Sequence, residues 1–527
     1  MYNILISDPL NQEGIEPLLK AKDVKVDIET GLKPEKLQQV ISDYHALLVR
    51  SQTQVSADII NAGNNLKVIG RAGVGVDNID LKAATQKGIM VLNAPEGNTI
   101  SAAEHTFAMM MAVARNIPQA YKSLVGGEWN RKAFQGAELN RKVIGIIGLG
   151  RIGAEVAKRA KVFNMKVIAY DPFLTKERAA KLGIEKGELD EVIAAADFIT
   201  VHTPLTQETK HLLNSEKLNK MKDGVRIINC ARGGIINEDD LYDAIKDGKV
   251  AGAAIDVFEN EPAVGHPLLT LPQVIATPHL GASTAEAQKN VAVDVSEGIL
   301  KVLHDQPFRN IVNYPPIPSD MMKKLTPYFG LCEKMGEMAI QLVKEKPDEI
   351  TISYSGELMD LETTPLTRGI LKGVLSYYLS TKVNFINAAF MAKQHDIAYT
   401  VEKKPYHQSF TSLITLHVKT GNHERVIAGT LIEGYGPRII RVGDYNIDIS
   451  PEGHLLFVHH HDRPGLIGRV GSILGEHDVN IATMQVGRKS AGGQAIMMLS
   501  VDKKIEKDVI SHLEKIDDII SVQEIDL

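Results

Sequence analysis

Cysteine is scarce in this 527-residue chain, which contains only Cys230 and Cys332. Two cysteines cannot build a disulfide framework, and such low usage is typical of a reducing compartment, so we expect a cytoplasmic protein. Aromatic residues are also few, at 5%, with a single tryptophan, Trp129. The sequence has no apolar run of about 18 residues that could span a membrane, and its first residues do not predict a signal peptide.

An excess of positive charge is missing as well. The chain has 59 Lys and Arg against 65 Asp and Glu, which gives a net charge of −6. This balance argues against nucleic acid or a membrane surface as the partner. The apolar content of 44% and the charged content of 24% are those of an ordinary globular protein. A chain of this length predicts several domains.

The clearest motif lies in residues 142–171, which read KVIGIIGLGRIGAEVAKRAKVFNMKVIAYD. A short apolar run, 143–147, is followed by Gly148, Gly150 and Gly153 and then by a helical pattern. In a GxGxxG loop these glycines permit a tight turn, close approach of a pyrophosphate, and close packing of the helix on the sheet. The N-terminus of the helix offers free N–H groups to the phosphates.

Asp171 follows the second apolar run, 18 residues after Gly153. A carboxylate at this place can bind a ribose hydroxyl and would repel a 2′-phosphate, so the motif favours NAD over NADP. A lone GxGxxG could be a glycine-rich turn of another α/β protein. The order of strand, helix, strand and acid favours dinucleotide binding.

Short apolar runs alternate with helical patterns on both sides of this motif, which predicts two doubly wound, Rossmann-like parallel sheets. The first unit lacks a GxGxxG loop, so we interpret it as substrate-binding. Its predicted strands are 4–7, 24–27, 46–49, 66–70 and 90–92, and its predicted helices are 15–19, 35–41, 56–62 and 81–86. After the motif, strands are predicted at 198–202, 225–229, 251–257 and 274–277, and a helix at 285–303 leads away.

Between the two sheets, residues 101–120 predict one long apolar helix, and 125–132 predict a loop that displays Trp129, Arg131 and Lys132. After a proline-rich linker at 313–319, residues 319–450 predict an α+β domain that begins with a helical stretch at 321–344. Arg438 and Arg441 in this domain could form an anion site or simply a solvated strand face. Residues 453–527 have the order β-α-β-β-α-β of a ferredoxin-like domain.

The histidines at 459–461 suggest a metal ligand set at first sight. Alternation along a strand sends His460 to the face opposite to His459 and His461. No further ligand spacing accompanies them, so we expect no metal site.

Three chemically capable residues, Arg232, Glu261 and His279, each follow a predicted strand of the dinucleotide sheet. Ligands bind beyond the carboxyl ends of such strands. For hydride transfer from an alcohol, histidine suits the base because its usual pKa is near neutrality. Arginine suits a carboxylate and the developing oxygen charge, and glutamate can pair with the imidazolium. Taken singly, they could be a loop histidine, a turn glutamate and a surface arginine.

The blocks GLGRIGAEVA, VRIINCARGGIINEDDL, AAIDVFENEP and TPHLGAST resemble the D-isomer 2-hydroxyacid dehydrogenase family. Within it, RAGVGVDNID, NAPEGNTISAAEH and the last block, HHHDRPGLIGRVGSILGEHDVNIATMQVGR, resemble the long-form 3-phosphoglycerate dehydrogenases. This resemblance implies NAD-dependent oxidation of 3-phospho-D-glycerate to 3-phosphohydroxypyruvate, the first step of L-serine biosynthesis. It assigns His279 as acid and base, Glu261 as its partner and Arg232 as the cation on the substrate.

The resemblance also implies ligand sets and domains. Around NAD it places Gly148, Gly150, Arg151, Ile152, Gly153, Asp171, Thr203, Cys230, Ala231, Asp256, Gly281 and Ala282. Around the substrate it places Arg50, Ser51, Val74, Gly75 and Asn98, with Arg131 and Lys132 as further candidate cations for the phosphate. It also implies that the loop with Trp129 and Arg131 could reach a neighbouring subunit's site. The implied domains are substrate-binding at 1–95 completed by 285–312, NAD-binding at 96–284, intervening at 319–450 and a regulatory ACT domain at 453–527.

An ACT domain binds amino acids and usually pairs side by side across a dimer. The matching effector positions, for L-serine, are His460, Asp462 and Asn480, and the aspartate departs from the asparagine of some members. A homodimer or homotetramer under amino-acid feedback is therefore expected.

Two other functions remain open on the sequence. Another D-2-hydroxyacid dehydrogenase, such as a glyoxylate or hydroxypyruvate reductase, would share the three catalytic residues but generally lacks the C-terminal domain. An NAD-sensing scaffold could keep the same fold and act by binding other proteins.

Overall fold

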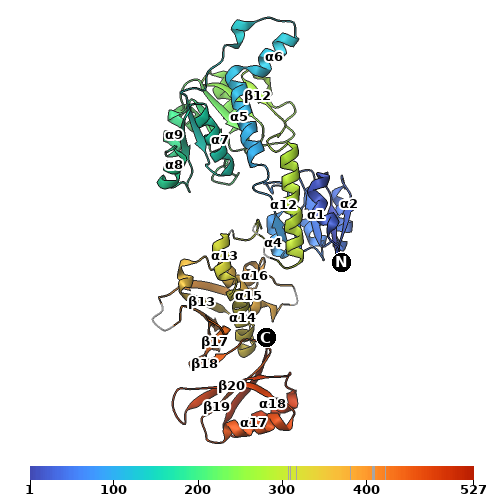
Figure 1. Ribbon diagram of the computed structural model, residues 1–527, viewed down its shortest axis with the longest axis vertical. Helices are drawn as coiled ribbons and strands as arrows, with labels where there is room; N and C mark the ends of the chain where they lie inside the picture. The colour runs from blue at the N-terminus through green and yellow to red at the C-terminus, as the bar shows by residue number, and fades with distance from the viewer. Residues whose placement is uncertain (307, 309, 316, 380–381, 406–409, 422) are drawn as a thin grey trace.

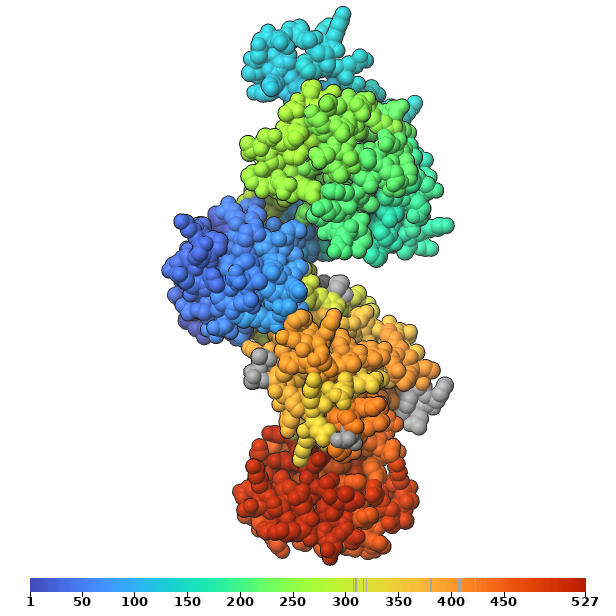
Figure 2. Space-filling view, turned by 180° about the vertical axis from the view of Figure 1, so that it is seen from behind, coloured from blue at the N-terminus to red at the C-terminus, as the bar shows by residue number. Residues whose placement is uncertain are grey.

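The structure is a computed structural model that describes residues 1–306, 308, 310–315, 317–379, 382–405, 410–421 and 423–527. The described strands form four sheets along an elongated molecule (Figure 1). The sheet that contains the strand before the glycine loop lies near one end of the molecule, and the C-terminal sheet lies at the other. The sheet formed by the first 92 residues lies between them (Figures 1 and 2).

The first sheet is parallel and has the order β2-β1-β3-β4-β5. Its strands are β1 (Tyr2–Ile6), β2 (Val24–Ile28), β3 (Ala46–Val49), β4 (Val68–Arg71) and β5 (Met90–Leu92). The helices of this unit are η1 (Gln12–Ile15), α1 (Glu16–Lys20), α2 (Pro34–Val40), η2 (Ile41–Asp43), α3 (Ala57–Ala62) and α4 (Leu81–Gln86). Helix α12 (Ala285–Leu303) returns to pack on this sheet, and its Val295 and Ile299 share a core with Ile4 and Ile6.

The second sheet is also parallel, with the order β12-β11-β10-β9-β6-β7-β8. Its strands are β6 (Val143–Ile147), β7 (Lys166–Tyr170), β8 (Glu185–Lys186), β9 (Phe198–Val201), β10 (Val225–Asn229), β11 (Val250–Ile255) and β12 (Val274–Ala276). The helices among these strands are α7 (Arg151–Val162), α8 (Lys176–Leu182), α9 (Leu189–Ala195), α10 (Ser215–Lys220), α11 (Glu238–Lys246) and η4 (Pro267–Thr270). The strand order reverses between β6 and β9, where doubly wound sheets bind their ligands.

The prediction of a single long helix at 101–120 is wrong, because the structure has two helices there. Helix α5 (Thr99–Arg115) ends at Asn116, whose φ of 52° is left-handed, and α6 (Ile117–Val125) follows at an angle. Asparagine tolerates this conformation at a helix C-terminus, and Pro118 lacks the N–H that a continued helix would need. We call residues 117–137 the arm: α6 and the short helix η3 (Arg131–Phe134) lie beyond the second sheet (Figures 1 and 2).

The third sheet is mixed, with the order β14-β13-β15-β16-β17-β18, and only the pair β13–β14 is parallel. Its strands are β13 (Glu349–Gly356), β14 (Ala398–Lys403), β15 (Ser412–Lys419), β16 (Glu424–Ile432), β17 (Gly436–Val442) and β18 (Tyr445–Ile449). Helices α13 (Ser319–Leu325), α14 (Tyr328–Val343), α15 (Thr364–Ser376) and α16 (Ala388–Gln394) and the short η5 (Glu357–Asp360) complete this unit.

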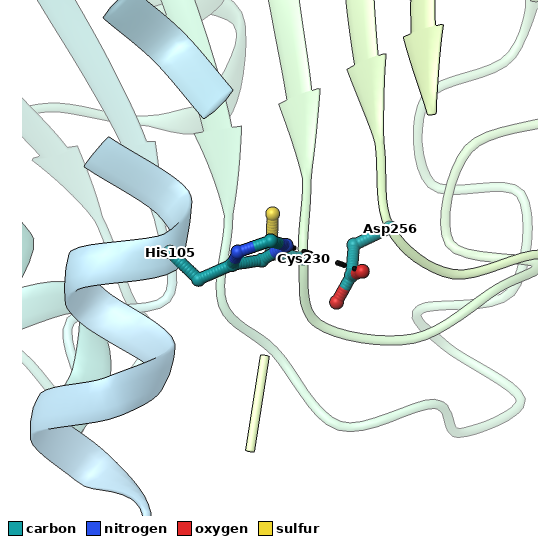
Figure 3. A group of neighbouring side chains, drawn as sticks. All are labelled: His105, Cys230 and Asp256. Atoms are coloured by element: carbon teal, nitrogen blue, oxygen red, sulfur yellow. Dashed lines mark ion pairs between the residues drawn. The ribbon is translucent and has the colours of Figure 1, made fainter. Parts of the chain in front are cut away.

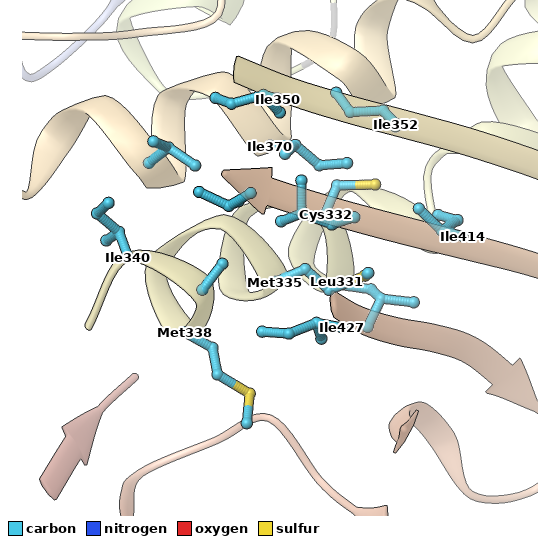
Figure 4. Packing of buried hydrophobic residues seen from close by; sticks show 14 of the residues in the cluster. Leu331, Cys332, Met335, Met338, Ile340, Ile350, Ile352, Ile370, Ile414 and Ile427 are labelled. Carbon is cyan, nitrogen blue, oxygen red and sulfur yellow. The ribbon is translucent and has the colours of Figure 1, made fainter. Parts of the chain in front are cut away.

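The helical stretch expected at 321–344 is interrupted, since α13 ends before Pro327 and α14 starts after it. The core of the third unit lies between α14 and the sheet, where Leu331 and Met335 belong to one buried cluster with Ile350 and Ile414 (Figure 4).

The fourth sheet is antiparallel, with the order β20-β21-β19-β22. Its elements in chain order are β19 (His454–His461), α17 (Leu466–Glu476), β20 (Ile481–Arg488), β21 (Gln494–Val501), α18 (Lys507–Glu514) and β22 (Ile519–Asp526). This confirms the ferredoxin-like prediction, as the first two sheets confirm the doubly wound one. Across the described part of the chain, none of the helices is long and apolar enough to cross a membrane.

Candidate active site

The glycine loop after β6 has the geometry that a dinucleotide requires. Gly148 has φ of 91°, a conformation that side chains disfavour, and a Cβ on Gly153 would lie 2.2 Å from the Gly148 oxygen. A Cβ on Gly150, by contrast, would meet nothing within 4 Å. The turn and the close helix packing thus account for the first and third glycines, and open space at the second leaves room for a phosphate at the N-terminus of α7.

Asp171 is fixed beside this loop by two backbone N–H groups. Leu149 donates to Oδ2 at 2.8 Å, and Phe173 donates to Oδ1 at 2.8 Å. The Oγ1 atom of Thr203, at the end of β9, is buried and has no hydrogen-bond partner among the described residues. An open phosphate cradle, an oriented acid and an unpaired hydroxyl together fit NAD.

His279 and Glu261, the two residues predicted to act as acid/base and its partner, contact each other directly. Glu261 Oε2 lies 2.9 Å from His279 Nδ1, and Glu261 Oε1 accepts the Phe258 N–H at 3.1 Å. Both side chains are partly exposed at the edge of the sheet. Because a carboxylate can only accept, Nδ1 carries the proton of a neutral imidazole, and Nε2 is left as the base.

Arg232 points toward the first unit rather than into its own sheet. Its Nε lies 3.3 Å from Asp77 Oδ2, and its Nη1 donates to the Ala231 carbonyl at 2.7 Å. A Cβ on Gly75 would lie 2.1 Å from Arg232 Nη2. The structure therefore brings Arg232 against the loop that contains Val74 and Gly75, as a shared substrate site requires.

The geometry agrees with comparisons to known proteins. Residues 107–281 match the family described as D-isomer specific 2-hydroxyacid dehydrogenase, NAD binding domain. Residues 324–443 match the D-3-phosphoglycerate dehydrogenase intervening domain, and 454–518 match the ACT domain. The chain is 46% identical to D-3-phosphoglycerate dehydrogenase of Bacillus subtilis over 527 residues, with all of both chains covered. It is also 46% identical over 528 residues to that of Methanocaldococcus jannaschii, again with complete coverage.

The chain belongs to the D-3-phosphoglycerate dehydrogenase family. Among solved structures, it is similar to D-lactate dehydrogenase from Aquifex aeolicus complexed with NAD and lactic acid. That comparison gives a TM-score of 0.54 at 30% identity and covers 59% of this chain and 99% of the other. The chain is an NAD-dependent oxidoreductase, as the sequence predicted.

The expected substrate loop after β3 is held from both sides. The buried Asp8 accepts the N–H groups of Arg50 at 2.6 Å and of Gln52 and Thr53 at 3.2 Å. Asn78 donates to the carbonyls of Arg50 at 2.9 Å and Thr53 at 2.7 Å. Arg50 and Ser51 therefore lie on a turn that hydrogen bonds to Asp8 and Asn78 hold in place.

A cation that the sequence analysis missed, Arg71, lies at the end of β4. Burial, together with the nearby charges of Arg232 and Arg50 and against the opposing effect of Asp77, lowers the pKa of Arg71 to about 10. Its Nε has no hydrogen-bond partner among the described residues. The strand-end rule that selected Arg232 could have found it, because Arg71 is the last residue of its strand.

The remaining expected NAD ligands have contacts within the protein. Arg151 lies 3.6 Å from Glu96, and Ile152 packs against the core of the second unit. The Ala231 N–H donates to Asn229 at 3.0 Å, and Ala282 is only partly buried. On the substrate side, Asn98 has a buried Oδ1 without a partner among the described residues.

Cys230 and Asp256 meet His105, a third residue that the sequence analysis did not select (Figure 3). One ligand atom from each lies within 4.8 Å of the others. Burial raises the pKa of the Cys230 thiol, which therefore stays protonated. The carboxylate of Asp256 accepts hydrogen bonds from His105, the Thr277 hydroxyl and the N–H groups of Leu280 and Gly281.

Arg131 and Lys132 lie on the arm, and the structure does not bring them to the predicted substrate residues of their own chain. Both are exposed, and nearby Trp129 is 80% exposed. Helix α6 buries none of its residues. Figure 1 shows the arm projecting from the end of the molecule that is remote from the first sheet.

The three expected effector residues do not form one cluster within a chain. His460 is buried at the end of β19, and Asp462 accepts a hydrogen bond from Arg488, at the end of β20, at 3.1 Å. Asn480 precedes β20 and donates to Asp502 at 2.9 Å. The length of β20 separates the two ends by roughly 25 Å. Within the described chain, the histidines at 459–461 are not part of a metal-binding cluster.

Proposed function

We propose that this enzyme oxidises 3-phospho-D-glycerate to 3-phosphohydroxypyruvate with NAD, as the first step of L-serine biosynthesis. The observation that carries the proposal is the hydrogen-bonded pair of His279 and Glu261 beside an NAD loop and a group of arginines. A substrate with a phosphate and a carboxylate needs more than one cation. Arg50, Arg71 and Arg232 supply positive charge on both sides of the cleft.

In the proposed reaction, His279 Nε2 takes the proton from the C2 hydroxyl group of the substrate. Glu261 holds Nδ1 and stabilises the imidazolium that forms. Arg232 turns from Asp77 to the substrate carboxylate and to the oxygen on which charge develops. Bound NAD supplies the acceptor for the hydride from C2. The arginines at 50 and 71 hold the phosphate.

The direct test is NAD reduction by the purified enzyme with 3-phosphoglycerate, D-lactate and glycerate as separate substrates. We expect kcat/KM for 3-phosphoglycerate to exceed the others by at least about 100-fold, since a site built for a charged group discriminates strongly against its absence. Equal turnover of D-lactate would show a general 2-hydroxyacid dehydrogenase instead.

We also propose the domain division given above, with 1–95 and 285–312 forming one substrate-binding domain and 96–284 the NAD-binding domain. Leu92 and Ile311 form a β-bridge, and Val312 donates to the Val91 carbonyl at 2.7 Å. Ile311 and Val312 therefore pair with the end of β5. The intervening domain at 319–450 and the ACT domain at 453–527 follow the substrate-binding domain in the chain.

The arm supports assembly into a homodimer or homotetramer. An amphipathic helix that buries no side chain in its own chain exposes a large apolar surface, which in a stable protein is usually covered. The exposed apolar residues are Ile117, Tyr121, Leu124, Val125 and Trp129. In such an assembly Arg131 or Lys132 would reach the neighbouring cleft. Light scattering measures the oligomeric state. Mixing inactive Arg131→Ala and His279→Ala subunits tests a shared site, because activity returns only if each subunit supplies the residue that the other lacks.

For the ACT domain we propose an L-serine site between two chains. His460 and Asp462 lie at one end of the sheet and Asn480 at the other, so one ligand can contact all three only if Asn480 comes from a second ACT domain. L-Serine should inhibit the enzyme, and Asn480→Ala should abolish inhibition without changing the uninhibited rate. Inhibition by serine that persists in Asn480→Ala would contradict this site.

A further inference from the structure

The loop that carries His279, residues 277–281, wraps around the carboxylate of Asp256. Leu280 donates its N–H to Oδ1 at 2.7 Å, and Gly281 donates its N–H to Oδ2 at 2.9 Å. The Thr277 hydroxyl donates to Oδ1 at 2.6 Å, and the His279 N–H donates to the Asp256 carbonyl at 2.9 Å. Asp256 is 1% exposed at the end of β11. A single buried side chain thus holds the catalytic loop.

His279 needs such support because its φ of 56° is in the left-handed region. A residue other than glycine in this conformation costs on the order of 1 kcal/mol, and the conformation persists only where neighbouring contacts hold it. The contacts to Asp256 come from residues on both sides of His279. They set the direction in which its imidazole leaves the backbone.

The fourth donor to this carboxylate comes from outside the loop. His105 on α5 places Nε2 3.2 Å from Asp256 Oδ1 and 3.1 Å from Thr277 Oγ1 (Figure 3). The Thr277 hydroxyl has one proton and gives it to Asp256, so it can only accept from His105. Nε2 of His105 therefore carries a proton, shared between the threonine oxygen and the carboxylate.

A carboxylate accepts about four hydrogen bonds, and Asp256 receives one from His105 and three from the loop. Burial alone would raise its pKa, but the hydrogen bonds from His105, Thr277 and Leu280 keep the pKa below its ordinary value. The nearby Cys230 completes a set of donor atoms that could hold a metal ion. A metal would have to displace donors that hold the loop, so a hydrogen-bonded anchor fits these contacts better.

We propose that His105 is a positioning residue for the oxidation: through Thr277 and Asp256 it holds the loop that directs His279 at the substrate. It lies on α5, whereas the loop follows β12, so it ties the catalytic residue to a helix that is distant in sequence. The inference rests on the proposed function for its substrate. Without His105, one acceptor position of a buried anion loses its donor, and the loop can shift.

The test compares His105→Met, which fills the space without a donor, with His105→Gln, whose side-chain N–H reaches about as far as Nε2. We expect His105→Met to lower kcat about tenfold, since small misplacements of a catalytic group have effects of this size or larger. KM for 3-phosphoglycerate and the Kd for NAD, measured by calorimetry, should change less than about threefold. His105→Gln should restore kcat to within about threefold of the unaltered enzyme.

His304→Met is the matched control, because His304 makes a comparable ion pair at 2.7 Å with Asp23 far from the loop. It should leave kcat within about twofold. Equal kcat in His105→Met and His304→Met, or equal loss in His105→Met and His105→Gln, would overturn the proposal.

A second comparison uses Thr277→Val and Thr277→Ser, because His105→Met could fail to fold. The serine variant keeps the hydroxyl and should retain most of kcat, whereas the valine variant should lose about tenfold. Equal rates in these two variants would also contradict the anchor. If the unaltered enzyme oxidises another 2-hydroxy acid but not 3-phosphoglycerate, the proposed function fails, and the same comparisons made with that substrate still decide the role of His105.

Discussion

Asp77 and Arg232 form an ion pair between the first and second units, with Asp77 Oδ2 3.3 Å from Arg232 Nε. Asp77 belongs to the first unit and Arg232 follows β10 of the second, so the pair joins the two sides of the proposed site. Arg232 is also the cation expected to hold the substrate carboxylate. The carboxylate of Asp77 thus occupies a position that the substrate must take.

Substitution Asp77→Asn should therefore ease substrate binding. Asp77 is largely exposed, and exposed ion pairs contribute about 0–1 kcal/mol, so KM for 3-phosphoglycerate should fall by up to about fivefold. Steady-state kinetics at low ionic strength measures this change. A rise in KM would mean that Asp77 orients Arg232 for the substrate rather than competing with it.

Glu261→Gln should lower kcat by about 100-fold with little change in KM, because the amide cannot stabilise the imidazolium that forms on His279. The amide keeps the size of the side chain, so the loop should stay folded. Glu259→Gln, two residues earlier, is a suitable control because Glu259 pairs with Lys210 and His211 instead. Similar rates in the two variants would rule out the assigned role of Glu261.

Asp171→Ser should relax the choice of cofactor. The carboxylate accepts from Leu149 and Phe173 beside the glycine loop, where it would repel a 2′-phosphate. We expect kcat/KM with NADP to rise at least about tenfold relative to NAD. Kinetics with both cofactors at saturating substrate gives the ratio, and an unchanged ratio would place the discrimination elsewhere.

His202 should make stability depend on pH. Burial lowers its pKa from 6.5 to about 4, so the folded protein keeps it neutral while the unfolded chain protonates it below 6.5. Its contribution is therefore complete above pH 6.5 and is lost as the pH falls toward 4, by up to about 3 kcal/mol. The variant His202→Gln should lose less stability than the unaltered chain over this range. Urea unfolding of both at pH 7 and pH 5 compares them, and identical losses would contradict the assignment.

Local features of the site were predictable because they depend on residues close in sequence. The tight turn at Gly148 depends on its own backbone conformation, with φ of 91°, and the packing at Gly153 involves Gly148, five positions earlier. The rule that ligands gather beyond parallel strand ends then selected His279 and Glu261, which the structure brings to 2.9 Å.

Other features depend on contacts between distant elements. Arg71 and His105 gain their significance from neighbours on other strands and helices, and Asp77 from a residue 155 positions away in the chain. The break at Asn116 also escaped the apolar pattern, because a left-handed residue can end a helix without interrupting its hydrophobic periodicity.

The sequence by itself determined the parallel sheets, the NAD loop and the chemical types available for hydride transfer, since short-range periodicity and turn geometry encode them. Only the tertiary structure decided that Asp256 and His105 contact the loop that contains His279, that the arm projects from the rest of its chain, and that Asn480 lies far from His460. These relationships arise from the packing of whole elements, which places side chains together or apart regardless of their separation along the chain.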